Sequence, residues 1–191
     1  MIFSFKQFIV KTTLVAVLAA MGLQAKAQTN SQTTRYNYFF LEAIRQQEMG
    51  NLAAAFDLLR HARDINPNAP EVYYELAGYY VEMQNNKAAR YNFERAAELA
   101  PNNSTYLEKL GQFYITQNDY EQALAAYEKL YANNKTREDV LQILYQLYGS
   151  QNNYKKMIEV TERMETLLGS SEQLSLTKMQ IFEQMGDKRK A

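Results

Sequence analysis

A period of about 34 residues runs from residue 36 to the last residue, and it constrains the fold more than any other feature. Pro67 and Pro101 lie one period apart, and each closes a similar run, FDLLRHARDINPN at 56–68 and RYNFERAAELAPN at 90–102. Steps of one period give four full frames and one partial frame, at 36–69, 70–103, 104–137, 138–171 and 172–191. Such a period is typical of a chain built from stacked copies of one supersecondary unit.

Each frame predicts two helices joined by a tight turn. Gly and Asn adopt a positive φ readily and so end a helix, and they stand near the middle of the frames at Gly50, Asn85, Asn118, Asn152 and Gly186. Each is followed by an Asn or Asp whose side-chain oxygen is expected to cap the second helix, namely Asn51, Asn86, Asp119, Asn153 and Asp187.

Two further sets of residues predict how the helices pack. Small residues let the two helices of a hairpin approach closely, and they recur at Ala43, Ala55, Ala77, Ala89, Gly111 and Ala123. Large residues are expected to fill the space between neighbouring hairpins, and they recur at Leu59, Tyr80, Phe93, Tyr114, Tyr127, Tyr148 and Phe182.

The second frame has the fullest pattern, with Tyr73, Leu76, Ala77, Tyr80, Ala89, Phe93, Ala96 and Pro101. The third follows with Leu107, Leu110, Gly111, Tyr114, Tyr120, Ala123 and Tyr127. These residues resemble the tetratricopeptide repeat family, whose units are helix–turn–helix hairpins of about 34 residues. The resemblance covers residues 36–191 and implies an all-α fold, a right-handed superhelical solenoid of antiparallel hairpins.

The two ends of the array depart from the family pattern. The first frame has polar residues, Glu42 and Gln46, at positions that are apolar in the second, third and fourth frames, which suits a capping repeat with no neighbour on one side. The fifth frame stops at Ala191, where its second helix is expected to begin. We therefore expect the chain to be an N-terminal fragment of a longer array.

Residues 1–27 have the pattern of a secretory signal peptide. Lys6 and Lys11 precede an apolar run at 14–23, and Ala25-Lys26-Ala27 matches the small-x-small pattern of a cleavage site. This apolar run is too short to cross a hydrocarbon core of about 30 Å. We predict export to the periplasm or cell envelope, with an uncleaved membrane anchor as the alternative and residues 28–35 as a polar linker without regular structure. A secretory signal before such an array is similar to proteins of the Bacteroides group of bacteria.

The composition excludes several classes of function. The chain has no cysteine, and its single histidine, His61, cannot form a zinc site alone, so we expect an exposed residue there. No Gly-rich phosphate loop, metal-ligand spacing or nucleophile beside a base is present, so we predict no catalytic residue, no metal and no cofactor. The charge is balanced at 21 basic and 21 acidic residues, without a basic cluster, which argues against a nucleic-acid partner.

The resemblance implies a concave groove lined by the first helix of each repeat, and the family's groove positions carry over residue by residue. The candidate partner-binding residues are Phe40, Ile44, Gln47, Tyr74, Gly78, Val81, Glu82, Glu108, Gln112, Ile115, Gln142 and Gln146. Apolar groups among them gather in the first two repeats, and glutamines in the third and fourth. They predict a groove for a peptide or protein with apolar anchors, unless Phe40 and Ile44 pack against Tyr74 and the N-terminal segment.

The predicted function is a non-enzymatic protein-interaction scaffold of the bacterial cell envelope. Two alternatives stay open, because the residues do not separate them. One is the sensor half of a larger signalling protein whose output domain lies beyond residue 191. The other is a subunit of an outer-membrane or secretion assembly machine. The sequence indicates neither the oligomeric state nor the identity of the partner.

We predict that the mature protein begins at Gln28, directly after the Ala25-Lys26-Ala27 pattern. Intact-mass spectrometry of protein from the native cell envelope measures this directly. A soluble cytoplasmic species that retains Met1 would contradict the predicted export.

Overall fold

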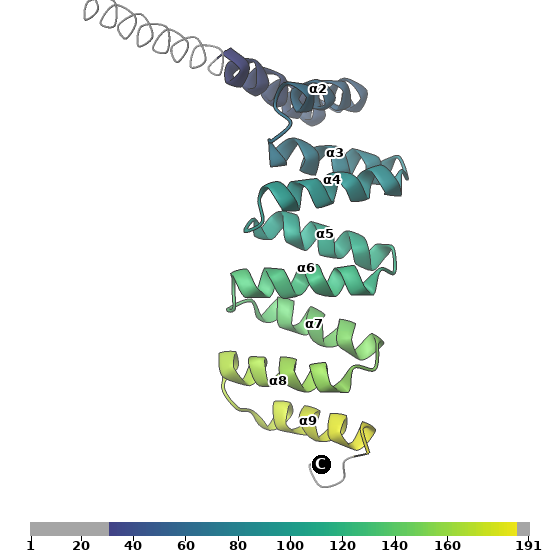
Figure 1. The fold of residues 1–191 in the computed structure, drawn as a ribbon, viewed down its shortest axis with the longest axis vertical. Coiled ribbons are helices and arrows are strands. Elements are labelled where there is room, and N and C mark those ends of the chain that lie inside the picture. The colour runs from purple at the N-terminus through teal and green to yellow at the C-terminus, as the bar shows by residue number, and fades with distance from the viewer. Residues whose placement is uncertain (1–30, 187–191) are drawn as a thin grey trace, which may run out of the picture. The chain divides into compact units, whose positions relative to one another are not determined.

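The structure is a computed structural model that describes residues 31–186, and this part of the chain is all-α, with no strand, as predicted. A helix at residues 31–48 comes first. The helices that follow are α2 (Leu52–Ile65), α3 (Pro70–Glu82), α4 (Asn86–Leu99), α5 (Ser104–Thr116), α6 (Tyr120–Asn133), α7 (Glu138–Ser150), α8 (Tyr154–Leu168) and α9 (Glu172–Gln184) (Figure 1).

The helices start at a regular spacing. α3, α5, α7 and α9 have 13 residues each and begin one sequence period apart; we call them, with the helix at 31–48, the A helices. The B helices α2, α4, α6 and α8 begin at Leu52, Asn86, Tyr120 and Tyr154, again one period apart. The helix pairs thus repeat with the period that the sequence has.

Most of the predicted turns are confirmed, and the second is corrected. Gly50, Asn118 and Asn152 have φ values of 79°, 59° and 55°. In the second repeat, however, the residue with positive φ is Gln84 rather than Asn85, because the turn must fall one period before the turn at Asn118. Glutamine has no preference for this conformation, so here the hairpin geometry overrides the local preference.

The predicted caps change accordingly. Asn85, one residue before the predicted Asn86, caps α4 by accepting a hydrogen bond from Ala88 N at 3.1 Å. Asp119 and Asn153 cap α6 and α8 as predicted. Asn51 makes no side-chain cap bond to α2, and its amide nitrogen donates to Gln46 Oε1 at 2.7 Å. The predicted cap Asp187 lies outside the described residues, as do the predicted signal peptide and its cleavage site.

The first repeat differs from the prediction at its start. Residues 31–35, predicted to be a linker without regular structure, are helical and exposed, because no Gly or Pro interrupts the helix that continues to residue 48. Further along this helix, Glu42 accepts hydrogen bonds from Arg45 and Gln46. The hydrogen bond from Arg45 and, to a smaller extent, the one from Gln46 lower the pKa of Glu42 to about 2. The polar groups at these positions are thus paired with one another on the helix.

The described chain divides into two compact parts, one ending at Tyr79 and the other beginning at Tyr80. In the N-terminal part, the helix at 31–48 packs on α2, where the ring of Phe39 meets exposed His61 edge-on at 4.2 Å between centroids. The Phe56 ring of α2 lies 5.7 Å from that of Tyr79 on α3. Aromatic contacts of this kind join the helices of this part.

In the C-terminal part, α4 to α9 follow one another as layers of alternating B and A helices (Figure 1). The pair of α5 and α6 shows how closely a hairpin can pack. A Cβ atom placed on Gly111 would stand 2.7 Å from Cε2 of Tyr127, and this tyrosine is only 1% exposed. The small residue predicted at this position is therefore required by an aromatic ring of the facing helix.

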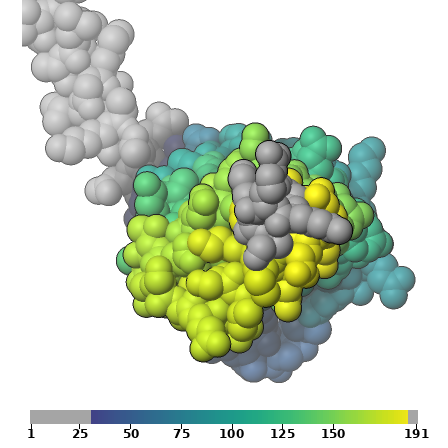
Figure 2. Space-filling view, turned by 90° about the horizontal axis from the view of Figure 1, so that it is seen from below, coloured from purple at the N-terminus to yellow at the C-terminus, as the bar shows by residue number. Residues whose placement is uncertain are grey.

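α9 lies at the C-terminal end of this part, and Figure 2 views the molecule from that end, with α8 in yellow-green and α9 in yellow. Ile181 is its buried residue, whereas Leu174, Met179 and Phe182 are half-buried, as expected for apolar groups that are only partly covered. Lys178 Nζ pairs with Glu165 Oε2 at 2.8 Å and so links α9 to α8. Within residues 31–186, no helix is long and apolar enough to cross a membrane.

We predict that Gly111→Ala destabilises the protein by about 1–3 kcal/mol, because the buried Tyr127 ring cannot move away from the added methyl group. Gly78→Ala is the matched control, since Gly78 is also helical but nothing lies within 4 Å of an added Cβ atom. There the higher helix propensity of alanine should stabilise by about 0.5–1 kcal/mol. Urea denaturation measures both changes, and shifts in the same direction for the two variants would show the packing argument to be wrong.

Candidate functional site

The predicted groove residues of the N-terminal part are half-buried or exposed. The Phe40 ring stacks on Tyr36 at 5.9 Å between centroids, with 12° between the planes. The Tyr36 hydroxyl in turn donates to Glu71 Oε1 of α3. Ile44 and Tyr74 are half-buried, and burial raises the pKa of Tyr74. Phe40 thus packs in part on Tyr36 of its own helix, whereas the alternative interpretation of the sequence placed it against Tyr74 and the N-terminal segment.

Other predicted residues are open to solvent. Gln47 and Glu82 are exposed, Val81 is 44% exposed, and the space beside Gly78 is open. On one helix, the spacing of Tyr74, Gly78 and Val81 places them along one face of α3. The role of this face in binding stays a prediction.

In the third repeat, Glu108 is held by an ion pair that the sequence analysis missed. Arg137 Nη2, from the loop between α6 and α7, lies 3.0 Å from Glu108 Oε2 and also pairs with Asp139. These hydrogen bonds from Arg137 hold the pKa of Asp139 below its usual range. Gln112 on the same helix is exposed, and Ile115 is half-buried. Glu108 is therefore one member of an ion-pair network with Arg137 and Asp139.

Gln142 and Gln146 are the predicted residues that line a pocket, which we call the A-face pocket. It lies between the A helices α7 and α9, with the B helix α8 beneath, and has a volume of about 260 Å³. Its lining residues are Gln142, Tyr145, Gln146, Thr161, Met164, Leu174 and Thr177. The pocket combines apolar walls with two side-chain amides, a composition common in sites that bind peptides or small molecules.

Neighbouring repeats are linked by a tyrosine–glutamate hydrogen bond that recurs with the period of the array. Tyr114 OH donates to Glu94 Oε1 at 2.7 Å, and one period later Tyr148 OH donates to Glu128 Oε1 at 2.9 Å. Each bond runs from an A helix to the preceding B helix. The sequence analysis placed these tyrosines between hairpins but missed their glutamate partners, although the two glutamates recur with the same period.

No group of three or more His, Cys, Asp or Glu side chains among residues 31–186 is arranged to hold a metal ion.

Comparisons with known proteins identify the repeats. A family model described as tetratricopeptide repeat matches residues 47–113, and a second with the same description matches residues 104–136. Residues 47–136 are therefore tetratricopeptide repeats, as the resemblance predicted. A search of curated proteins finds no match.

Solved structures agree with this fold. The crystal structure of MamA protein matches with a TM-score of 0.60 and 16% identity, over 81% of this chain and 85% of that one. YrrB is a tetratricopeptide protein described as having an unusual peptide-binding site. It matches with a TM-score of 0.59 and 14% identity, over 80% of this chain and 78% of that one. A tetratricopeptide repeat protein from Parabacteroides merdae matches with a TM-score of 0.62 and 19% identity, over 82% of this chain and 62% of that one. At these identities, the likeness establishes the fold alone.

We predict that Tyr148→Phe flattens the loss of stability at alkaline pH. Burial, and then the hydrogen bond to Glu128, raise the pKa of Tyr148 to about 12, whereas an unfolded tyrosine ionises near 10. Because the folded pKa is the higher one, this contribution is complete below about pH 10 and is lost as the pH rises through about 12.

Urea denaturation at a series of pH values between these limits measures the effect. Tyr38→Phe, at a side chain that is 64% exposed, is the control and should keep the wild-type profile. Identical profiles for Tyr148→Phe and the wild type would contradict the assignment.

Proposed function

We propose that the chain is a non-enzymatic scaffold of the bacterial cell envelope that binds a protein or peptide along its A helices. The observation that carries this proposal is the A-face pocket, because it lies among predicted groove residues and is hollow. Tetratricopeptide repeats have the fold of protein-interaction scaffolds, and the one described for YrrB has a peptide-binding site.

The lining of the A-face pocket favours a neutral, apolar side chain as the group that enters it. Tyr145, Met164 and Leu174 supply apolar surface, and burial raises the pKa of Tyr145. Lys178, next to the lining residue Thr177, is already paired with Glu165 at 2.8 Å, and Glu138 accepts a hydrogen bond from Gln142 Nε2 at 3.0 Å. An anionic ligand group would therefore lose its hydration here without gaining an unpaired cation.

The two glutamines suit the backbone of an extended peptide. A side-chain amide both donates and accepts hydrogen bonds, as a peptide group does. Gln142 and Gln146 are one helical turn apart on α7, exposed, and both at the pocket. A peptide that places one apolar side chain in the pocket can therefore bond its backbone to the rim. Polar main-chain contacts with an apolar anchor are a common mode of peptide recognition.

The pocket volume is consistent with one anchor side chain. A closed apolar cavity of about 150 Å³ is enough to hold benzene, and the A-face pocket has about 260 Å³. An aromatic or long aliphatic residue is therefore the expected anchor.

The test is selection of displayed random peptides on the full chain, followed by calorimetry with a selected peptide. Gln142→Ala and Gln146→Ala should each weaken binding about 2- to 10-fold, the effect of one lost hydrogen bond. Thr177→Trp should abolish binding, because the ring fills the pocket. Gln180→Ala, at an exposed residue of α9 outside the pocket, is the control and should bind as the wild type. If selected peptides bind all these variants equally, the A-face pocket is not the site.

A further inference from the structure

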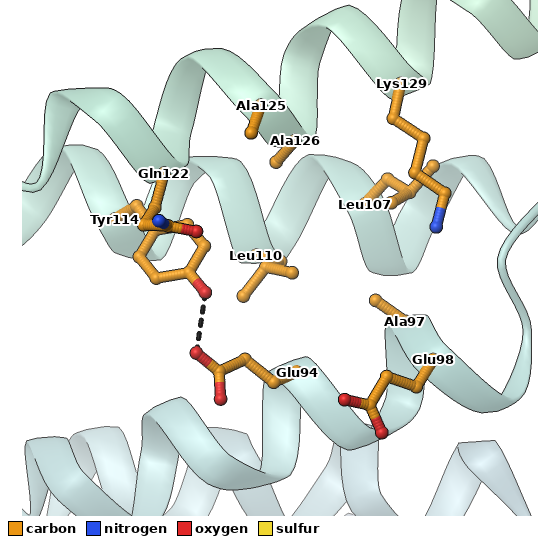
Figure 3. A pocket seen from close by; sticks show the side chains of 10 residues that line it. All are labelled: Glu94, Ala97, Glu98, Leu107, Leu110, Tyr114, Gln122, Ala125, Ala126 and Lys129. Carbon is orange, nitrogen blue, oxygen red and sulfur yellow. Dashed lines mark hydrogen bonds between the residues drawn. The ribbon is translucent and has the colours of Figure 1, made fainter.

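A second hollow of about 320 Å³ lies in the C-terminal part, between the B helices α4 and α6, with the A helix α5 as its floor (Figure 3). We call it the B-face pocket. Its lining residues are Glu94, Ala97, Glu98, Leu107, Leu110, Tyr114, Gln122, Ala125, Ala126 and Lys129. The A-face pocket opens between two A helices and this one between two B helices, so the two belong to different faces of the stack.

The B-face pocket has an apolar floor and a charged rim. Leu107 and Leu110 form the floor. The small side chains of Ala97 on α4 and of Ala125 and Ala126 on α6 leave space on both sides (Figure 3). Glu94 and Glu98 stand on the α4 side. Oε1 of Glu94 accepts hydrogen bonds from Tyr114 OH at 2.7 Å and from Arg90 Nε at 2.8 Å, whereas Oε2 accepts none within the described chain. One acceptor atom at the rim is thus available to a ligand.

In the next repeat, the position equivalent to the B-face pocket is filled by a side chain of the chain itself. One period further along the chain, Glu128 corresponds to Glu94 and Arg163 corresponds to Lys129. There, Arg163 Nη1 lies 3.0 and 2.8 Å from the two carboxylate oxygens of Glu128. The Arg163 guanidinium also lies over the ring of Tyr131, 5.2 Å from its centroid. The chain's own arginine therefore occupies this position between α6 and α8.

The B-face pocket is hollow because the corresponding groups are smaller. Ala97 stands where the next repeat has Tyr131, and Ala126 stands where it has Val160. Lys129 replaces Arg163 and forms no ion pair within residues 31–186. Four lining residues have the same residue type one period later. Glu94, Leu107, Leu110 and Tyr114 correspond to Glu128, Leu141, Leu144 and Tyr148. The acidic and apolar parts of the arrangement are thus present without a counterpart of Arg163. Arg90, which has leucine at the equivalent position of the next repeat, pairs instead with Oε1 of Glu94 and leaves Oε2 open.

We propose that the B-face pocket binds an arginine side chain presented by a partner protein. The guanidinium pairs with Oε2 of Glu94 and with Oε1 of Glu98, and the methylene stem lies on the apolar floor. Glu98 is 64% exposed, and its Oε2 is already paired with Arg95 Nη1 at 3.0 Å. Arginine fits better than lysine, because its planar group binds a carboxylate through two donors and is more weakly hydrated. This surface is separate from the proposed peptide site and does not depend on it.

The test is NMR titration of the full chain with N-acetyl-arginine amide. Saturable shifts are expected at the amides of residues 94–98 and 122–129. N-acetyl-lysine amide should bind more weakly, and N-acetyl-norleucine amide, which has the stem without the charge, should produce no saturable shift. Glu94→Gln should weaken arginine binding about tenfold, the effect of one lost charged hydrogen bond.

A double variant introduces into the B-face pocket the two side chains, tyrosine and arginine, that fill the equivalent position of the next repeat. Ala97→Tyr with Lys129→Arg should abolish the arginine-dependent shifts while the helical circular dichroism is retained. Glu98→Gln, a change at the exposed rim, should weaken binding without affecting folding, and it decides the outcome if the double variant does not fold. An absence of saturable shifts with arginine, equal shifts with norleucine, or undiminished binding by Glu98→Gln would overturn the proposal.

Discussion

The contact between the backbone of Gly111 and the ring of Tyr127 sets the distance between α5 and α6, and the packing of the third repeat depends on it. Within the hairpin, the ring of one helix occupies the place of a missing side chain on the other. Interiors packed in this way leave no room for a ligand. Two hollows of the described chain lie instead where two helices of the same kind flank a third, as α7 and α9 flank α8, and α4 and α6 flank α5. Both of our proposals therefore concern the faces of the stack.

Much of the fold follows from the sequence period, because each helix packs mainly on its neighbours in sequence. The turn at Gln84 shows where local preference fails: the residue has no tendency to a positive φ, and only comparison with Asn118 and Asn152 places it. Asn51 stands at the predicted cap position, but its side chain bonds to Gln46 and not to the first turn of α2. Both errors concern neighbouring polar residues, of which one takes the positive φ or the capping bond. The conformational propensity of a single residue cannot decide between them.

The candidate site was predictable only in part. Gln142 and Gln146 follow from their register on the A helix, but Leu174 and Thr177 complete the pocket from another repeat, and their approach depends on how α9 packs. The B-face pocket results from differences between repeats: alanine in one repeat, and tyrosine or valine at the equivalent position of the next. A pattern shared by all repeats does not contain this information, whereas a comparison of equivalent positions does. The ion pair between Arg163 and Glu128 then indicates which chemistry suits the unfilled copy.

The central claim is that a partner protein is recognised at the A-face pocket. It is tested most directly by a photo-crosslinking amino acid placed at Gln146 in the cells that make the protein. The same amino acid at Gln180 of α9, which is exposed but does not line the pocket, serves as the control. Our account predicts one discrete protein adduct from position 146 and none from position 180. Equal adducts from both positions, or none from position 146, would contradict it.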